Sequence, residues 1–146
     1  MSKPPLVAPL AGRDGNARAT PEPMGETMEY MMLIHEGENE RAARNDPQRV
    51  EAYWGSWTAY VQALAQSGVM KSGNGLQPPV IATTVRLRDG KRHVQDGPYA
   101  DSKEQLGGYF ILDVPDLDVA LDWAARCPAA ADGSIEIRPV MAMQPG

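Results

Sequence analysis

The sequence has a single cysteine, Cys127, and only two histidines, His35 and His93. One cysteine cannot close a disulfide within the chain, and so few soft ligands give no spacing typical of a zinc site. The cationic residues are scattered, and the formal net charge is −5. Because nucleic-acid interfaces need a basic patch, we expect no nucleic-acid partner. Because cysteine and histidine are so few, we also expect no bound metal.

Long apolar runs are also missing. No window approaches the roughly 18 uninterrupted apolar residues of a membrane-spanning helix. The N-terminal stretch PPLVAPLAG is too short and too rich in proline for the core of a signal peptide. We therefore expect a cytoplasmic protein with no membrane partner.

What is present indicates one globular domain after a tail. The chain has 146 residues, of which 42% are hydrophobic and 23% charged, as in ordinary soluble domains. Residues 1–27 are rich in proline and glycine and have no helical or strand periodicity. They predict a disordered or loosely packed N-terminal tail, and residues 28–146 predict the domain.

One long helix is predicted between Asn45-Asp46-Pro47 and Gly68. Asn and Asp are good N-caps, Pro is tolerated at the first helical position, and Gly is common just after a helix. An apolar stripe follows helical spacing: Val50, Tyr53, Trp54, Trp57, Val61 and Leu64. We interpret its two tryptophans as core or dimer contacts rather than as a stacking platform.

Strands are predicted at residues 30–34, 69–75 and 81–87. Asp89-Gly90 predicts a two-residue hairpin turn, since both residues tolerate positive φ. The resulting register places Val85 opposite Val94 on a buried face, and His93 on the solvent side.

Ser102 and Gln105 have the spacing of a capping box, which predicts a short helical turn ended by Gly107. The next strand, residues 109–114, is apolar on both faces and therefore central. A helix with Asp116 in its first turn follows Pro115. Its predicted buried stripe is Leu117, Ala120, Leu121, Ala124 and Cys127, and a last strand covers residues 135–140. This order of elements matches an α+β fold of the ferredoxin-like split β-α-β type.

Three stretches resemble one protein family. They are Asp96-Gly97-Pro98-Tyr99, Ser102 to Tyr109, and Asp113 to Asp118. The sequence resembles the YCII-related, or DGPF-domain, family over about residues 28–141, with Tyr99 where Phe is usual. The resemblance implies a homodimer that forms a dimeric α+β barrel.

The same resemblance implies candidate site residues. A His and Asp pair is suspected as an acid/base centre in this family; the motif gives Asp96, and His35 is the candidate imidazole. An imidazole titrates near neutrality, and a carboxylate beside it would orient it. The alternative is that Asp96 only secures its own turn.

The implied pocket-lining residues are Tyr99, Lys103, Glu104 and Tyr109, although Lys103 and Glu104 also fit an exposed turn. Two functions stay open. One is a cofactor-free enzyme acting on a small organic molecule in the dimer cleft. The other is a non-catalytic, metabolite-binding or regulatory protein with the same fold.

Overall fold

The computed structural model describes residues 26–142, so the predicted tail at residues 1–27 lies outside the described residues except for its last two positions. The elements along the chain are β1 (Met28–Glu36), α2 (Glu38–Ala43), α3 (Val50–Ser67), β2 (Met70–Gly75), η1 (Pro79–Ile81), β3 (Thr83–Arg88), β4 (Lys91–Asp96), β5 (Gln105–Val114), α4 (Leu117–Arg126), η2 (Pro128–Ala131) and β6 (Ser134–Pro139).

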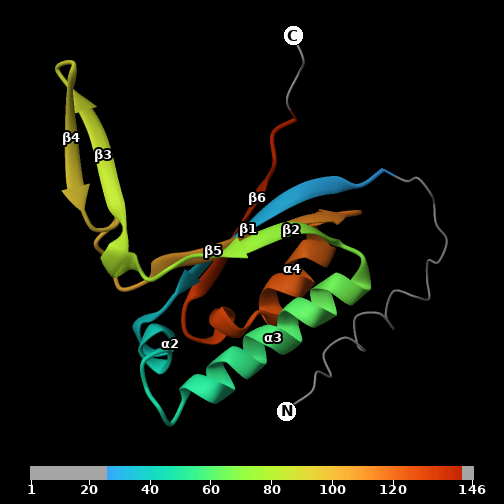
Figure 1. Ribbon diagram of the computed structural model, residues 1–146. Helices are drawn as coiled ribbons and strands as arrows, with labels where there is room; N and C mark the ends of the chain where they lie inside the picture. The colour runs from blue at the N-terminus through green and yellow to red at the C-terminus, as the bar shows by residue number, and fades with distance from the viewer. Residues whose placement is uncertain (1–25, 143–146) are drawn as a thin grey trace.

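The main sheet is four-stranded, in the order β2-β5-β1-β6, and strands β3 and β4 form a separate two-stranded sheet. All neighbours in the main sheet are antiparallel. Helices α3 and α4 lie against one face of the main sheet, and the β3-β4 hairpin projects away from its end (Figure 1). The predicted α+β class is confirmed.

The two central strands, β1 and β5, divide their side chains between the two faces of the sheet, because alternate residues of a strand point to opposite sides. Tyr30, Met32 and Ile34 of β1 are buried beneath the helices, as are Phe110 and Leu112 of β5. The opposite face carries Met31, Leu33, Tyr109 and Ile111, all half-buried. The sequence prediction that β5 is central and apolar on both faces is confirmed.

Helix α3 begins three residues later than its cap signal suggests. Asp46 makes a turn of its own before the helix, because its carboxylate accepts from the Gln48 amide at 2.9 Å and from the Arg49 side chain at 2.9 Å. The helix ends as predicted at Gly68, whose φ of 84° is the left-handed conformation that glycine adopts at little cost.

Helix α4 follows Pro115 as predicted, but Asp116 is its N-cap rather than a residue of its first turn, and its buried stripe is shifted. The carboxylate of Asp116 accepts from the Val119 amide at 3.0 Å, which satisfies a donor of the first turn. Leu117 and Leu121 are exposed, so their predicted burial is wrong, and Trp123 is buried instead. Because Trp is larger, placing Trp123 in the core removes more apolar surface from water than either leucine would.

The hairpin has the predicted register, with Val85 opposite Val94 and Arg86 opposite His93. Asp89 and Gly90 both have positive φ, and His93 is exposed as predicted. The predicted burial of Val85 and Val94 is wrong, since 61% and 59% of their surfaces are exposed. The alternation sets the register correctly, but nothing in the described chain covers the apolar face.

The helical turn predicted at Ser102 to Gly107 is also wrong. The Ser102 hydroxyl donates to the Glu104 carbonyl at 2.6 Å, and the Gln105 amide donates to the carbonyls of Ala100 and Ser102. The two side chains therefore hold a tight loop rather than a helix N-terminus. Residues from Gln105 onward pair with β1 as part of β5.

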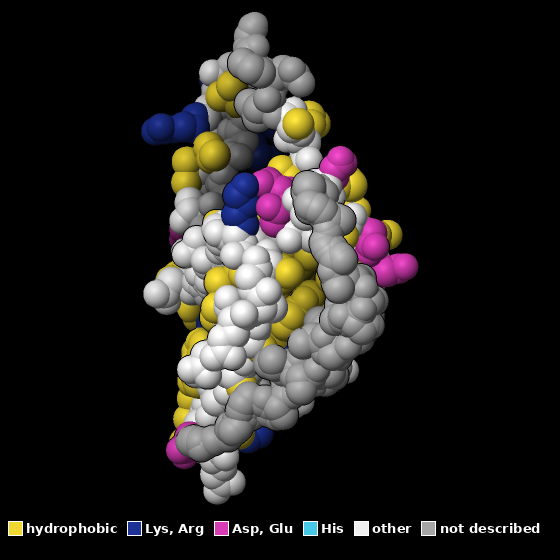
Figure 2. All heavy atoms as spheres, turned by 90° about the vertical axis from the view of Figure 1, so that its right-hand side faces the viewer, with side chains coloured by type: hydrophobic (Ala, Val, Ile, Leu, Met, Phe, Trp, Pro, Cys, Tyr) yellow, Lys and Arg dark blue, Asp and Glu magenta, His cyan; other side chains and the backbone are white. Residues whose placement is uncertain are grey.

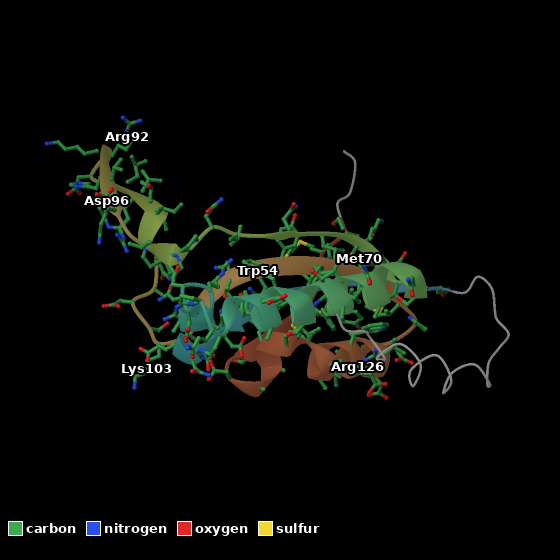
Figure 3. All side chains as sticks on the ribbon, turned by 60° about the horizontal axis from the view of Figure 1, so that its bottom comes forward. Trp54, Met70, Arg92, Asp96, Lys103 and Arg126 are labelled. Atoms are coloured by element: carbon green, nitrogen blue, oxygen red, sulfur yellow. The ribbon has the colours of Figure 1, made fainter. Side chains whose placement is uncertain are left out.

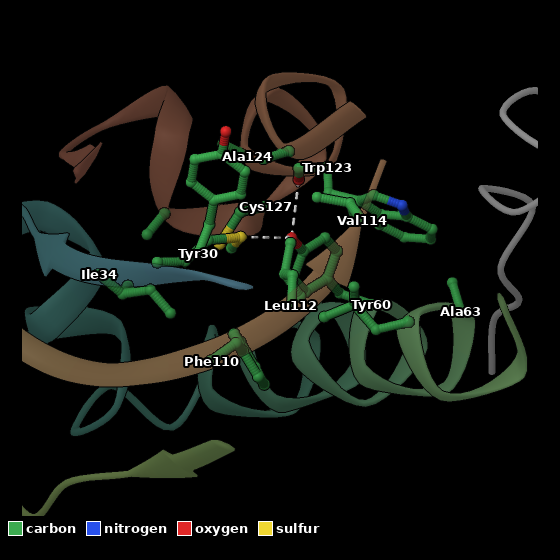
Figure 4. Packing of buried hydrophobic residues seen from close by; sticks show 14 residues of the cluster. Tyr30, Ile34, Tyr60, Ala63, Phe110, Leu112, Val114, Trp123, Ala124 and Cys127 are labelled. Carbon is green, nitrogen blue, oxygen red and sulfur yellow. Dashed lines mark hydrogen bonds between the residues drawn. The ribbon is translucent and has the colours of Figure 1, made fainter. Parts of the chain in front are cut away.

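The core lies between the main sheet and helices α3 and α4 (Figure 4). Within it, the Tyr60 hydroxyl of α3 donates to the Trp123 carbonyl of α4 at 2.7 Å, and both residues are almost fully buried. This bond ties the two helices together where water cannot replace it.

Tyr60→Phe should lower the free energy of unfolding by about 1–3 kcal/mol, because the Trp123 carbonyl is left buried without its donor. Urea denaturation gives the measurement. Tyr30→Phe is the matched control, since among residues 26–142 the Tyr30 hydroxyl has a single weak partner, the Met28 sulfur at 3.8 Å. Equal losses in the two variants would contradict the role of the Tyr60 bond.

Charged side chains of both signs lie next to one another on the side of the molecule seen in Figure 2, with hydrophobic side chains between them. That side carries no single-sign field that would attract a polyanion. Within residues 26–142, no helix combines the length and apolar character needed to cross a membrane.

Candidate functional site

A cavity of about 640 Å³ opens between helix α3 and the edge formed by β2 and β5, on the helix-covered side of the sheet. Most of its wall is apolar, and Figure 3 shows Trp54 on α3 and Met70 on β2, two of its lining residues. A second cavity of about 430 Å³ shares Arg44, Trp54 and Gln77 with the first. The two hollows are therefore neighbours that meet around Arg44.

A buried carboxylate lines the larger cavity. Glu36, the last residue of β1, is only 3% exposed. Its side chain follows Tyr30, Met32 and Ile34 on the same face of the strand. The Tyr53 hydroxyl of α3 donates to Glu36 Oε2, and the Arg44 guanidinium lies 3.9 Å from Glu36 Oε1. Burial of a charged group is costly unless it is paired, and these two partners meet that requirement.

Arginines position the polar end of this cavity. The Arg44 guanidinium stacks 5.2 Å from the Trp54 ring and 5.8 Å from the Tyr53 ring, as expected for cation–π contacts. Arg41 Nη1 donates to the carbonyls of Glu36 and Lys103 at 2.8 and 2.7 Å. Arg41 thus fixes the end of β1 against the loop before β5, and Arg44 is left at the cavity wall.

The environment of Glu36 changes the acidity of its neighbours. Burial raises the pKa of Tyr53 well above its ordinary value, and the hydrogen bond to Glu36 raises it further. Burial also raises the pKa of Glu40, with added repulsion from Asp132 and Glu36. Tyr53 is therefore held as a neutral donor to the carboxylate at neutral pH.

Two glycines keep the floor of the cavity open. A Cβ on Gly107 would lie 3.0 Å from Glu36 Oε1, and a Cβ on Gly73 would lie 2.3 Å from the Phe110 ring. Contacts this short force the neighbour to move. A side chain at either position would displace the carboxylate or the ring that lines the cavity.

The structure gives His35 a different partner from the one predicted. His35 Nε2 lies 3.1 Å from Glu136 Oε1 of β6, and Asp96 ends β4 opposite Thr83, on the projecting hairpin (Figure 3). Within the described chain, no hydrogen bond or ion pair joins His35 to Asp96. Their joint acid/base role stays a prediction, and no contact between them within the described chain supports it.

The four predicted pocket residues lie in three separate places. Tyr99 is 82% exposed at the base of the hairpin, under the Arg86 guanidinium. Lys103 and Glu104 lie in the loop before β5, where Glu104 accepts from the Ser134 hydroxyl. The Tyr109 hydroxyl accepts from the Asn74 amide at 3.1 Å. None of the four lines either cavity, so their binding role stays a prediction.

Comparison with known sequences identifies the family of this chain. The model of the YCII-related domain matches residues 28–144. The chain belongs to the YCII-related family. It is also similar to the uncharacterized protein R00369 of Rhizobium meliloti (strain 1021), at 32% identity over 123 residues, which cover 82% of this chain and 97% of that protein. The resemblance inferred from the Asp-Gly-Pro motif is thereby confirmed.

In this YCII-related chain, sequence reasoning missed Glu36, Tyr53 and Arg44 as a group. One signal could have found Glu36, since it continues the apolar alternation of β1 with a carboxylate. No spacing connects it to Arg44 or Tyr53, which reach it from other elements. Across residues 26–142, no cluster of three or more His, Cys, Asp or Glu side chains is arranged to hold a metal ion.

Proposed function

We propose that this YCII-related protein binds a small organic molecule in the cavity beside α3, with a polar group of the molecule against Glu36. The cavity itself supports the proposal. Its volume of about 640 Å³ lies in the range of small-molecule sites, roughly 300–1,000 Å³, which are mostly apolar with a few convergent polar groups.

The lining specifies the chemistry of the ligand. Trp57, Val61 and Phe110 suit an aromatic or branched apolar body. A carboxylate has several lone-pair sites, and Tyr53 uses only part of that capacity on Glu36. The Arg44 guanidinium is too far from Glu36 for a short hydrogen bond and still has donors available. A polar group with one donor and one acceptor, such as an amide or a hydroxyl next to a carbonyl, would satisfy both.

The second candidate is the cofactor-free acid/base enzyme, and the observation in its favour is a buried carboxylate that lines a cavity. Glu36 would accept a proton from the bound molecule, while Tyr53 and Arg44 stabilise the negative charge that develops on that molecule. This candidate replaces the His35 and Asp96 pair by Glu36 as the proton acceptor.

Gly75→Leu should abolish ligand binding without unfolding the protein. Gly75 lines the cavity, and nothing lies within 4 Å of a Cβ built there. The new side chain would thus occupy free space. The measurement is a thermal-shift screen of small metabolites, where a true ligand at 100 times its Kd stabilises the native state by about 2.7 kcal/mol.

Gly55→Ala on α3 is the matched control, because it also has open space but does not line the cavity. Compounds that stabilise the wild type should stabilise Gly55→Ala equally and leave Gly75→Leu unchanged. Equal shifts in all three proteins would refute this binding site. For any ligand found, product analysis with wild type and Glu36→Gln then separates an enzyme from a binding protein.

A further inference from the structure

The second cavity, of about 430 Å³, lies between the connection from α2 to α3 and the segment that joins β2 to β3. Its lining is more polar than that of the larger cavity, since Arg41, Arg44, Asn45 and Gln77 contribute to it. Arg44, Trp54 and Gln77 line both cavities. The two cavities therefore share a wall, where one bound molecule would contact both.

The charged residues around the two cavities do not balance. The second cavity is lined by two charged residues, Arg41 and Arg44, and both are cations. Glu36 lines the larger cavity, whereas Glu38 and Glu40 of α2 line neither. Two cations and one anion leave the combined lining with a formal charge of +1. A concave site with unbalanced charge attracts a ligand of the opposite sign.

Arg44 has hydrogen-bond donors to offer to such a ligand. Its side chain is only 17% exposed, and its guanidinium lies 3.9 Å from Glu36 Oε1, which is an ion pair but too long for a hydrogen bond. Within residues 26–142, the guanidinium donates no hydrogen bond. Side-chain donors this well shielded from water normally have acceptors. The contact with the Trp54 ring, at 5.2 Å, holds the planar group in place.

Arg41 adds a second guanidinium that is already fixed. Its Nη1 donates to the carbonyls of Glu36 and Lys103, and no other atom of its side chain makes a hydrogen bond in the described part of the chain. The Nε and Nη2 donors are thus unused. A guanidinium presents its donors as a planar fork that matches the two oxygens of a carboxylate. The amides of Asn45 and Gln77 supply neutral donors beside it.

We propose that Arg41 and Arg44 form an anion subsite in the second cavity, and that the ligand is a small α-hydroxy carboxylic acid. This inference rests on the proposed binding in the larger cavity and names the ligand class. The carboxylate binds the two arginines, the adjacent hydroxyl donates to Glu36, and the apolar side chain lies against Trp57 and Phe110. One negative charge on the ligand balances the lining, whereas a phosphate dianion would exceed it.

The test compares each acid with its own primary amide by isothermal titration calorimetry. The probes are phenyllactate, with an aromatic side chain, and α-hydroxyisocaproate, with a branched one. The amide keeps the hydroxyl and the side chain and loses only the charge. In the wild type, the Kd of each acid should be at least about 10-fold lower than that of its amide, because charge-assisted hydrogen bonds to arginine are about twice as strong as neutral ones.

Gln77→Glu should remove this preference. It places a carboxylate of the same size at an exposed position that lines both cavities, where it competes with the ligand for the arginines. The acid should bind less than about 3-fold more tightly than the amide, while the Kd of the amide changes little. Arg92→Gln, on the exposed end of the hairpin, is the matched control, since it changes the net charge by the same amount and should keep the preference.

The outcomes separate this inference from the proposed function. Equal Kd values for acid and amide in the wild type, with both lost in Gly75→Leu, would overturn the anion subsite and leave binding in the larger cavity intact. A preference for the acid that survives in Gln77→Glu would also overturn the subsite. Acid binding unchanged in Gly75→Leu would instead overturn the larger cavity as the binding site. If neither acid binds, the proposed ligand class is wrong.

Discussion

Raising the pH from 7 to 11 should remove about 4 kcal/mol from the free energy of unfolding through two buried groups at the contact between α3 and α4, and Tyr53, whose pKa is also raised by burial, should add to the loss. Burial raises the pKa of Cys127 from 9.0 to about 12, and burial raises the pKa of Tyr60 above its ordinary 10.0. Above pH 9 the unfolded chain ionises first at the thiol, and above pH 10 at the phenol. Both groups therefore contribute stability at neutral pH that is lost as the pH rises toward the folded-state pKa values.

The thiol accounts for the largest share of this loss. At pH 11 the solution is about two units above the unfolded pKa of Cys127 and one unit above that of Tyr60, at about 1.36 kcal/mol per unit. Urea denaturation at pH 7, 9 and 11 provides the measurement. Cys127→Ala should lose roughly half of the pH dependence, because Tyr60 and Tyr53 supply the rest, whereas Tyr99→Phe, at an exposed position, should keep all of it. A wild type equally stable at pH 7 and pH 11 would contradict the burial of these groups.

Local chemistry made part of the fold predictable from the sequence. Asp89-Gly90, Gly68 and Asp116 each act through their own backbone and nearest neighbours, so their turn, stop and cap do not depend on distant residues. The prediction of secondary structure failed where a contact with a residue distant in sequence determines the local conformation. Ser102 and Gln105 have capping-box spacing, but Gln105 pairs with Glu36 in the sheet. Strand pairing there outweighs one short helical turn, which costs entropy to nucleate.

The candidate site was less predictable for the same reason. Resemblance to the family pointed to His35 and Asp96, while the cavity is built around Glu36. Tyr53 is 17 residues from Glu36 in sequence, and Arg44 precedes α3 by several residues. Their approach depends on how α3 packs on the sheet, and no spacing in one sequence encodes it.

Glu36→Leu should lower the free energy of unfolding by about 3 kcal/mol, although it replaces a buried charge by an apolar side chain of similar length. The substitution leaves the Tyr53 hydroxyl without its acceptor and the Arg44 guanidinium without its ion-pair partner in a partly closed cavity, and that penalty exceeds the gain from an added leucine. Glu36→Gln should cost only about 1 kcal/mol, because its amide oxygen still accepts from Tyr53. The measurement is urea denaturation at pH 7, with Glu38→Leu on exposed α2 as the control.

A double-mutant cycle isolates the bond that carries this effect. If Tyr53 and Glu36 stabilise each other, Tyr53→Phe should cost about 1–2 kcal/mol in the wild type and much less in Glu36→Leu, since the acceptor is already gone. Strictly additive losses would separate the two residues. A Glu36→Leu protein more stable than the wild type would reject the structural role of the carboxylate. Such a gain would mean that the chain keeps a costly buried charge for binding or catalysis, because functional groups are often retained at the expense of stability.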